Sequence, residues 1–289
     1  MPVQPIVRSI VRPTVTGIVR SFGSSFVSRF GADLSAAYFL KDLGSKRGFV
    51  DGVLNPVVRV RRSNGDLRAF TANDITTGVL LAWVGTGGSD NGLVAKWYDG
   101  SGNHHDATQD TVGNMPKIVN AGALVAGGIL FDGVNDFLPT SFSPGVTTEQ
   151  SLFTIFKANT VDGSFRTHLD ARDANDDGIG FGIKSSLGFR FHVDSSDRNA
   201  PANTNKEMLT GIYGSSSSAI YQKGLKIADG SAPLATSGVT SNYHIGNTPS
   251  GVGPFSGLIE GVFIYSTDKS SQRVDIESAL AEEYNITLA

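Results

Sequence analysis

Short apolar runs separated by polar turn residues fill the chain from residue 93 onward. The runs are rich in Val, Ile, Leu, Phe and Tyr, and Gly, Asn, Asp and Ser lie between them. This spacing is typical of antiparallel strands joined by tight turns. We expect strands at Leu93–Tyr98, Lys117–Asn120, Ala123–Phe131, Ser151–Ala158, Phe165–Asp170, Ile179–Lys184, Leu187–Val193, Glu207–Tyr213, Ala219–Ile227, Tyr243–Gly246 and Phe255–Tyr265. The pattern predicts an all-β chain folded as an antiparallel β-sandwich.

A few short helices are expected at the two ends of this strand-rich region. The predicted elements are a helix within residues 31–45, a strand over Asn55–Arg62 closed by a turn at Asn64-Gly65, a helix over Asp74–Val84 and a last helix over Ser270–Tyr284. Leu34 and Tyr38, four residues apart, indicate the first helix. In the last helix, Arg273 and Glu277 form an i,i+4 pair, and we expect Val274 and Leu280 to face inward.

Composition supports a turn-rich β-protein and excludes several other classes. Of 289 residues 35 are Gly, only 18% are charged and none is Cys. The absence of cysteine excludes a disulfide framework, a thiolate metal site and a cysteine nucleophile. The longest apolar run, Ala121–Phe131, is far shorter than the ~20 residues that span a bilayer, so we expect a soluble protein without a membrane span.

Charge divides the chain into an arm, residues 1–30, and a body, residues 31–289. The arm contains four Arg and no acidic residue, so it carries +4 and the body −7 within a net charge of −3. The arm is rich in β-branched residues and interrupted by Arg and Pro, a pattern unlike a secretory signal. Its apolar side chains favour an assembly arm that becomes ordered on a partner, and a disordered terminus without a role is the alternative. The expected anchoring residues are Ile6, Val7, Arg8, Arg12, Ile18, Val19 and Arg20.

An Asp-rich tract offers a candidate metal site. Asp173, Asn175 and Asp177 alternate ahead of Gly178, as oxygen ligands do in the first half of a calcium loop. The acid that should occupy the twelfth position of such a loop is replaced by Lys184, which excludes an EF-hand. A hairpin loop without an ion is the default interpretation, and a different Ca²⁺ site on these three residues is the alternative. No other cofactor is expected.

Other chemistries find little support. His104 and His105 are adjacent, so in a strand they would point to opposite faces, and we expect a solvated loop rather than a metal site. The Gly-rich stretch at residues 85–88 lacks the Lys-Ser/Thr of a phosphate loop. The acidic body would repel phosphates, so nucleic acid is not an expected partner.

Several segments together resemble a known group of sandwich domains. They are Ala36-Ala37-Tyr38, the run from Trp97 to Asn103, Phe131-Asp132-Gly133 with Asn135-Asp136, and the run from Phe255 to Glu260 followed by the last helix. The chain resembles the concanavalin A-like (laminin-G-like) jelly-roll domains of bacteriophage virion proteins, whose first half is similar to the catalytic domain of arabinofuranosidase B. From the residues alone, we expect the Asp99-to-Asn103 and Asp132-to-Asp136 segments to form tight turns.

The resemblance implies a virion structural protein made in the host cytoplasm, either a head decoration, a head fibre or a tail adhesin. Its implied partners are other virion proteins, reached through the arm, further copies of itself, as in trimeric phage fibres, and a host surface glycan. The alternatives are a glycoside hydrolase related to arabinofuranosidases and a free-standing lectin. A hydrolase needs two carboxylates about 5–9 Å apart. We find no such pair by comparison with that family, so catalysis is not the favoured interpretation.

Overall fold

Two antiparallel sheets and a small hairpin make up the structure. The computed structural model describes residues 24–173, 177–184, 188–194, 196–214, 216–232, 235–236 and 241–289. The large sheet contains β1 (Leu34–Phe39), β4 (Val58–Arg61), β5 (Leu67–Phe70), β6 (Gly92–Trp97), β7 (Ala107–Thr108), β8 (Lys117–Asn120), β9 (Ala123–Leu124), β10 (Ile129–Asp132), β12 (Glu149–Ala158), β17 (Lys206–Gly214), β18 (Ser217–Gln222), β19 (Leu225–Ser231) and β21 (Ser256–Tyr265). The prediction of an all-β antiparallel sandwich is confirmed.

The second sheet is smaller and has the order β11-β20-β13-β14-β15-β16. Its strands are β11 (Leu138–Pro139), β13 (Arg166–Asp170), β14 (Ile179–Lys184), β15 (Gly188–Val193), β16 (Ser196–Ala200) and β20 (His244–Ile245). The remaining elements are the hairpin β2 (Phe49–Val50) and β3 (Val53–Leu54), the helices α1 (Phe26–Phe30), α2 (Ala72–Thr76), α3 (Val79–Val84) and α4 (Arg273–Tyr284), and a 3-10 turn, η1 (Val112–Asn114).

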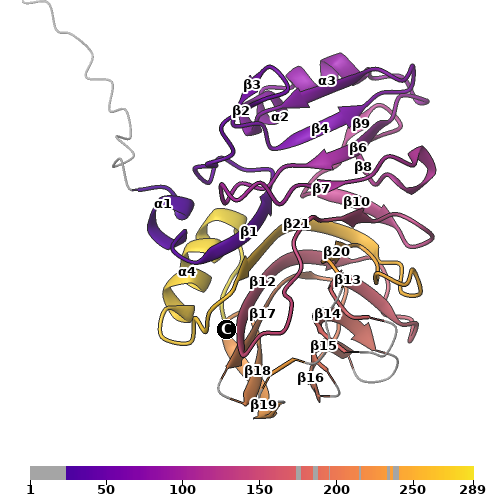
Figure 1. The fold of residues 1–289 in the computed structure, drawn as a ribbon. Helices are drawn as coiled ribbons and strands as arrows, with labels where there is room; N and C mark the ends of the chain where they lie inside the picture. Colours follow the sequence, from indigo (N-terminus) through magenta and orange to yellow (C-terminus); the bar gives the residue numbers. More distant parts are fainter. Residues whose placement is uncertain are drawn as a thin grey trace, which may run out of the picture.

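The central strands of the large sheet are buried on both faces. Along β12, Leu152 and Phe156 pack toward the small sheet, whereas Phe153 and Ile155 pack toward α1 and α4. Figure 1 shows the result, with α1 and α4 on one side of β12, β17 and β21, and β13–β15 on the other. An unbroken apolar run is what a strand covered on both faces requires, because successive side chains point to opposite faces.

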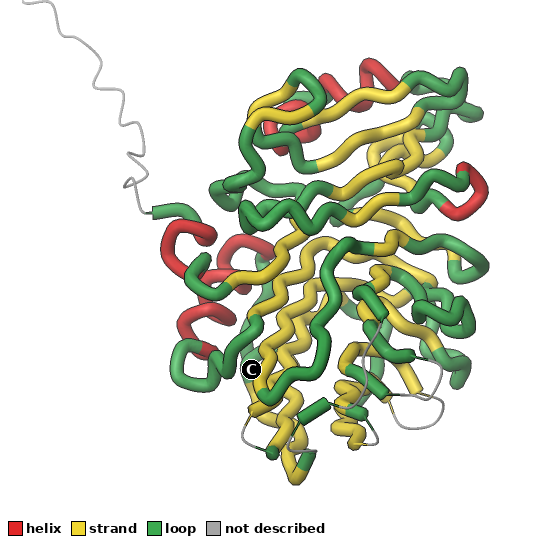
Figure 2. The backbone as a smooth tube through the Cα atoms, in the orientation of Figure 1, coloured by secondary structure: helices red, strands yellow, loops and turns green. Residues whose placement is uncertain are grey.

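The far end of the large sheet has its own cover. Figure 2 shows α2 and α3 lying across the strands at the end opposite β18 and β19. Leu80 and Val84 of α3 are buried with Phe70 of β5, and Trp83 meets the Phe70 ring edge-on at 5.3 Å. The large sheet therefore stays covered beyond the reach of the small sheet.

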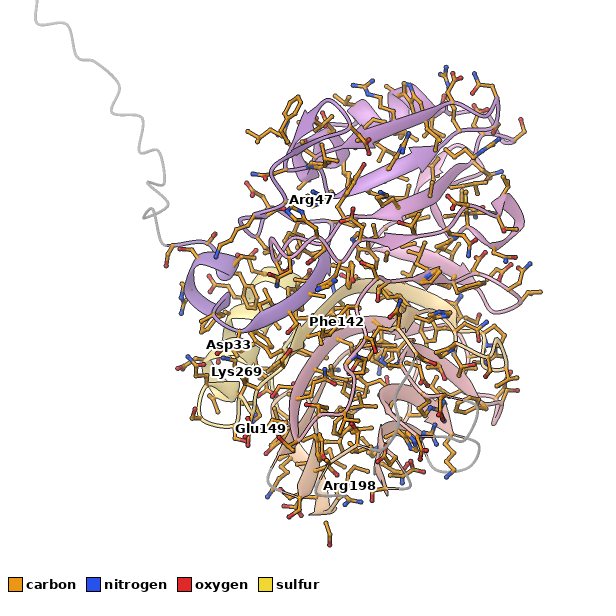
Figure 3. All side chains as sticks on the ribbon, in the orientation of Figure 1. Asp33, Arg47, Phe142, Glu149, Arg198 and Lys269 are labelled. Carbon is orange, nitrogen blue, oxygen red and sulfur yellow. The ribbon has the colours of Figure 1, made fainter. Side chains whose placement is uncertain are left out.

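Arg198 links the edge of the small sheet to the edge of the large sheet. Arg198 lies on β16, at the edge of the small sheet, and its Nε donates to the carbonyl of Ser218 at 3.2 Å. Its Nη2 donates to the carbonyl of Ser231 on β19. Figure 3 places Arg198 at the lower end of the molecule, where β16 approaches β18 and β19. The edge of one sheet is thus held to the edge of the other.

The helix predicted within residues 31–45 is wrong, because this segment is strand β1. It pairs with β21, where Ala37 lies opposite Phe263. Ala36 and Tyr38 face the sandwich core, and Leu34 and Phe39 face the α1 and α4 side. Burial on both faces and pairing with β21 override the local helical spacing.

The other helices differ from expectation in detail. The helix predicted over Asp74–Val84 is divided into α2 and α3 by Gly78, whose φ is +80°. Thr71 caps α2 in a capping box with Asp74. In α4 the Arg273–Glu277 ion pair is confirmed, and Leu280 is buried. Val274 is 59% exposed, which contradicts its expected inward position.

The end of the predicted arm belongs to the packed body. Phe26, Val27 and Phe30 of α1 are buried, and the Phe26 ring lies 5.0 Å from that of Phe263 on β21. The anchoring residues Ile6, Val7, Arg8, Arg12, Ile18, Val19 and Arg20 lie outside the described residues. Within the part of the chain that the structure describes, no helix is both long and apolar enough to cross a membrane.

Asp99 joins the turn after β6 to the neighbouring strand β1. Its side chain is fully buried, and its carboxylate accepts hydrogen bonds from the backbone N–H groups of Ala37 at 2.8 Å and His105 at 3.0 Å. Ser101 donates to it from both N–H and Oγ. The Asp99 segment thus forms a turn, as predicted, and it also fixes β1 in place.

Replacing Asp99 should destabilise the whole body. The change Asp99→Ala leaves the buried N–H groups of Ala37 and Ser101 and the part-buried N–H of His105 without their acceptor. We expect it to lower the free energy of unfolding by about 3 kcal/mol. The exposed Asp110 provides the control, since Asp110→Ala should change stability by less than about 0.5 kcal/mol. Urea unfolding of both variants measures this. Equal stability of the two variants would contradict the role given to Asp99.

Candidate functional site

The outer face of the small sheet carries a cluster of charged residues. Along β15, Phe189, Phe191 and Val193 pack between the sheets. Side chains alternate along a strand, so Arg190 and His192 point to the outer face. Both are nevertheless buried, with 5% and 2% of their surface exposed.

The central strand of this sheet contributes two glycines to the same face. Ile179, Phe181 and Ile183 of β14 point into the core, which leaves Gly180 and Gly182 on the outer face. Gly180 lies opposite His192 and Gly182 opposite Arg190. A Cβ atom at either glycine would come within 2.7 Å of a carbonyl oxygen of β13. Side chains from β13 and β15 therefore flank a stretch of β14 that has none.

A cavity of about 570 Å³ lies on this face. Its lining combines three basic side chains, Arg172, Lys184 and Arg190, one carboxylate, Asp173, two hydroxyls, Thr248 and Ser250, and two apolar side chains, Phe165 and Val252. The segment that carries Thr248, Ser250 and Val252 follows β20 and then runs beside β13, where Thr167 bonds to the carbonyl of Gly253 at 2.8 Å.

Asp170 holds Arg172 in a fixed orientation. The Asp170 carboxylate accepts from the backbone N–H of Arg172 at 2.7 Å and from its Nε at 2.8 Å. Nη2 of the same guanidinium lies 2.6 Å from Oδ2 of Asp170. Asp170 is 1% exposed and Arg172 7% exposed. Two guanidinium nitrogens thus share Oδ2 of Asp170, while the backbone N–H of Arg172 binds Oδ1, and this buried ion pair fixes the guanidinium.

Asp197 organises the opposite side of the cavity. Its carboxylate lies 2.7 Å from Nζ of Lys184, 3.4 Å from Nη1 of Arg190 and 2.8 Å from Nδ1 of His192. Burial tends to raise the pKa of Asp197, but the hydrogen bonds from His192 and Lys184 and the charge of Arg190 hold it well below its ordinary value. Asp197 therefore stays ionised and fixes the cations around it.

Phe165 supports both guanidinium groups. The Cζ atoms of Arg172 and Arg190 lie 5.0 and 5.2 Å from the centre of its ring, which is cation–π range. The ring also packs on Gly253, where a Cβ would come within 2.7 Å of it. Phe165 thus serves as the apolar support of two arginines on this face.

Two of the three candidate calcium ligands lie in the described residues. Asp173 and Asp177 belong to one local turn, with the N–H of Asp177 donating to Oδ1 of Asp173 at 3.1 Å. Asn175 lies outside the described residues. Among the residues that the structure describes, no group of three His, Asp or Glu side chains could hold a metal ion. His104 lies on a loop with φ +64°, and its Nδ1 is 2.8 Å from Nη1 of Arg47.

The buried glutamates lie away from this cavity and are paired with bases. Glu207 is 3.0 Å from Nζ of Lys223, and Glu260 is 2.7 Å from Nζ of Lys206. Asp173 is the one carboxylate among the described residues that line the cavity. The described lining of the cavity therefore presents mainly hydrogen-bond donors, from cations that Asp170 and Asp197 pair with.

A second pair of acids closes the turn after β10. The Asp136 carboxylate accepts from the N–H of Asp132 at 2.9 Å, and Asp132 accepts from the N–H of Val134 at 2.8 Å. This bears out the tight turn expected at Asp132 to Asp136. Burial, and then the negative charge of Asp132, raise the pKa of Asp136 to about 7.

Of the residues singled out from the sequence, Asp173 lines the cavity, and the other described lining residues were not predicted. Phe165, Arg172, Lys184 and Arg190 are distant from Thr248 and Ser250 in sequence, so no local motif joins them. The one available signal is Arg190, a charged residue between Phe189 and Phe191 in β15.

Comparison with known proteins shows the fold. No family model and no curated protein matches the chain. Among solved structures, an arabinofuranosidase complexed with arabinofuranosyl-α-1,2-xylobiose has a TM-score of 0.63 and 12% identity over 89% of this chain. A GH54 α-L-arabinofuranosidase soaked with a cyclic sulfate inhibitor has a TM-score of 0.62 and 12% identity over 91% of this chain.

These likenesses show the fold alone. The chain covers 64% and 65% of the two arabinofuranosidase chains, and the identities are too low to carry more than the fold. A structural similarity to arabinofuranosidases, as expected from the sequence, is thus present as a shared architecture.

The raised pKa of Asp136 predicts a pH-dependent stability. Its ordinary value is 3.8, so its contribution is fully present below pH 3.8 and is lost as the pH rises through about 7. Asp136→Asn keeps the acceptor oxygen but cannot ionise. We expect the melting temperature of the variant to rise relative to that of the unchanged chain between pH 4 and pH 8.

The exposed Asp110 again serves as the control. Melting curves of Asp110→Asn should run parallel to those of the unchanged chain over the same pH range. A parallel course for Asp136→Asn would show that Asp136 ionises normally in the folded state.

Proposed function

We propose that this chain is a non-catalytic carbohydrate-binding sandwich of a bacteriophage virion, and that it binds glycan in the cavity on the outer face of the small sheet. The observation that carries the proposal is the cavity itself, about 570 Å³ in volume and lined by fixed polar side chains. Its size suits a sugar unit, and binding sites of this kind combine an apolar surface with a few precisely placed polar groups.

The polar groups are already ordered before a ligand arrives. Asp170 fixes Arg172, and Asp197 fixes Lys184 and Arg190. Ordering a long side chain on binding costs roughly 0.5–1.5 kcal/mol, and this cost is largely met in advance here. Thr248 and Ser250 add hydroxyls at the rim of the same cavity.

A glycoside hydrolase is the second candidate function. What favours it is the shared fold with arabinofuranosidases. Against it stands the lining of the cavity, which offers Asp173 alone among its described carboxylates. A retaining or inverting mechanism requires a second carboxylate across the bond to be cleaved.

The virion role rests on the charge division and on the resemblance to phage domains. Residues 1–30 carry +4 and residues 31–289 carry −7, so the two parts of the sequence suit different surroundings. We place the attachment in the arm and the glycan site on the body, which would present the cavity away from the particle. Further copies of the chain, a trimer among the possibilities, complete the expected partners.

Removing the Phe165 ring should abolish glycan binding without unfolding the chain. Phe165→Ala takes away the support of two guanidinium groups, and we expect affinity for the glycans retained on an array to fall at least tenfold. Phe49→Ala is the matched control, because Phe49 is 74% exposed on the β2–β3 hairpin, far from the small sheet in Figure 1. The full chain should release no 4-nitrophenol from 4-nitrophenyl α-L-arabinofuranoside. Turnover of that substrate, or equal loss in both variants, would overturn the proposed role of the cavity.

Deleting residues 1–23 of the arm should prevent attachment to the particle while leaving the body folded. The cut belongs before Ser24, since Phe26 and Val27 are part of the core. We expect a chain that begins at Ser24 to melt within about 2 °C of the full chain, and to join particles at least tenfold less during infection. Incorporation equal to that of the full chain would exclude the arm as the anchor.

A further inference from the structure

We infer that the glycan recognised by the cavity is acidic, and that a sugar carboxylate binds between Arg172, Arg190 and Lys184. This inference rests on the proposed function and names its ligand class. Among the described lining residues, three cations and one carboxylate line the cavity. Asp170 and Asp197 pair with these cations, so the charges of the cluster balance, and the lining is distinguished by its excess of hydrogen-bond donors.

The donor-rich lining suits an acceptor-rich ligand. The hydroxyls of a neutral sugar need acceptors such as Asp and Asn as well as donors, and Asp173 is the only carboxylate among the described lining residues. A carboxylate brings two acceptor oxygens and a full negative charge, which guanidinium and ammonium groups satisfy directly. The chemistry of the lining therefore selects a uronic or sialic acid over its neutral counterpart.

Guanidinium geometry reinforces this choice. Nε and Nη2 of Arg172 both contact Oδ2 of Asp170 at less than 3 Å, which fixes the orientation of the guanidinium. A guanidinium carries five N–H donors, so one group can serve a protein carboxylate and a ligand carboxylate together. Arg172 and Arg190 are more than nine-tenths buried, and ionic hydrogen bonds gain strength where water is excluded.

Stacking of a neutral sugar is correspondingly disfavoured. A sugar that stacks on an aromatic ring needs an open ring face. Both guanidinium groups lie over the Phe165 ring, and Gly253 packs against it. The ring thus orients cations instead of offering its face to a sugar.

Paired ligands that differ only in charge provide the test. We would titrate the full chain by calorimetry with trigalacturonate and its methyl ester, and with 3′-sialyllactose and lactose. The acidic member of at least one pair should bind at least tenfold more tightly than its neutral partner. Its affinity should fall further when NaCl is raised from 50 to 300 mM, because added salt screens the attraction. The pair that shows the difference identifies the source of the carboxylate.

A matched pair of variants locates the effect in the cavity. Val252 lines the cavity and is 68% exposed, so it can be replaced without disturbing the core. Val252→Glu places a competing carboxylate there and should weaken the acidic ligand at least tenfold. Val252→Gln has the same shape without the charge and should bind the acidic ligand at least tenfold more tightly than Val252→Glu.

The outcomes separate the inference from the proposed function. Equal or tighter binding of the neutral ligands would overturn the acidic class while leaving a glycan site. No binding of any glycan, on this panel or on an array, would overturn the proposed function itself. Equal effects of Val252→Glu and Val252→Gln on an acidic ligand would show that the charge of the cavity does not select it.

Discussion

Burial of β12 and β21 on both faces is the constraint from which the rest of the structure follows. A strand with apolar side chains on both of its faces must be covered by other elements on both faces. The small sheet covers one face through residues such as Phe181 and Phe191, and α1 and α4 cover the other through Phe26 and Leu280. The apolar side chains of the small sheet therefore point to its inner face, and polar groups occupy its outer face.

The charged cluster on that outer face is stable because each buried cation has a carboxylate. Asp170 serves Arg172, and Asp197 serves Lys184 and Arg190. Unpaired burial of the Arg172 or Arg190 charge would cost several kcal/mol, so each carboxylate partner is a condition for its arginine to remain in place. The ion pairs that offset the cost of burying these charges also hold the side chains in fixed orientations. A binding site with fixed side chains loses less conformational entropy when a ligand binds.

How far the sequence predicts this molecule depends on whether a feature is local. The alternation of apolar and polar residues predicted β8 and β14 with the bounds that the structure has. Such period-two patterning is a property of one segment and needs no information from the rest of the chain. It failed at β1, where Leu34 and Tyr38 fit helical spacing and strand alternation equally well, and pairing with β21 decided the outcome. The cavity could not be predicted, because register across three strands and a distant loop brings its residues together. The Asp-rich tract predicts oxygen ligands, and the pairing of the neighbouring Asp170 with an arginine could not be read from it.

The central claim is that Arg172 and Arg190 receive the ligand. The most direct measurement is an NMR titration of the full chain, labelled with ¹⁵N at arginine, in which the side-chain Nε–Hε signals are followed as trigalacturonate or 3′-sialyllactose is added. Our account predicts that the signals of Arg172 and Arg190 move together with one of these ligands, while that of Arg198, which ties β16 to β18 and β19, stays in place. Saturable binding that shifts other arginines and leaves those of Arg172 and Arg190 unchanged would contradict it.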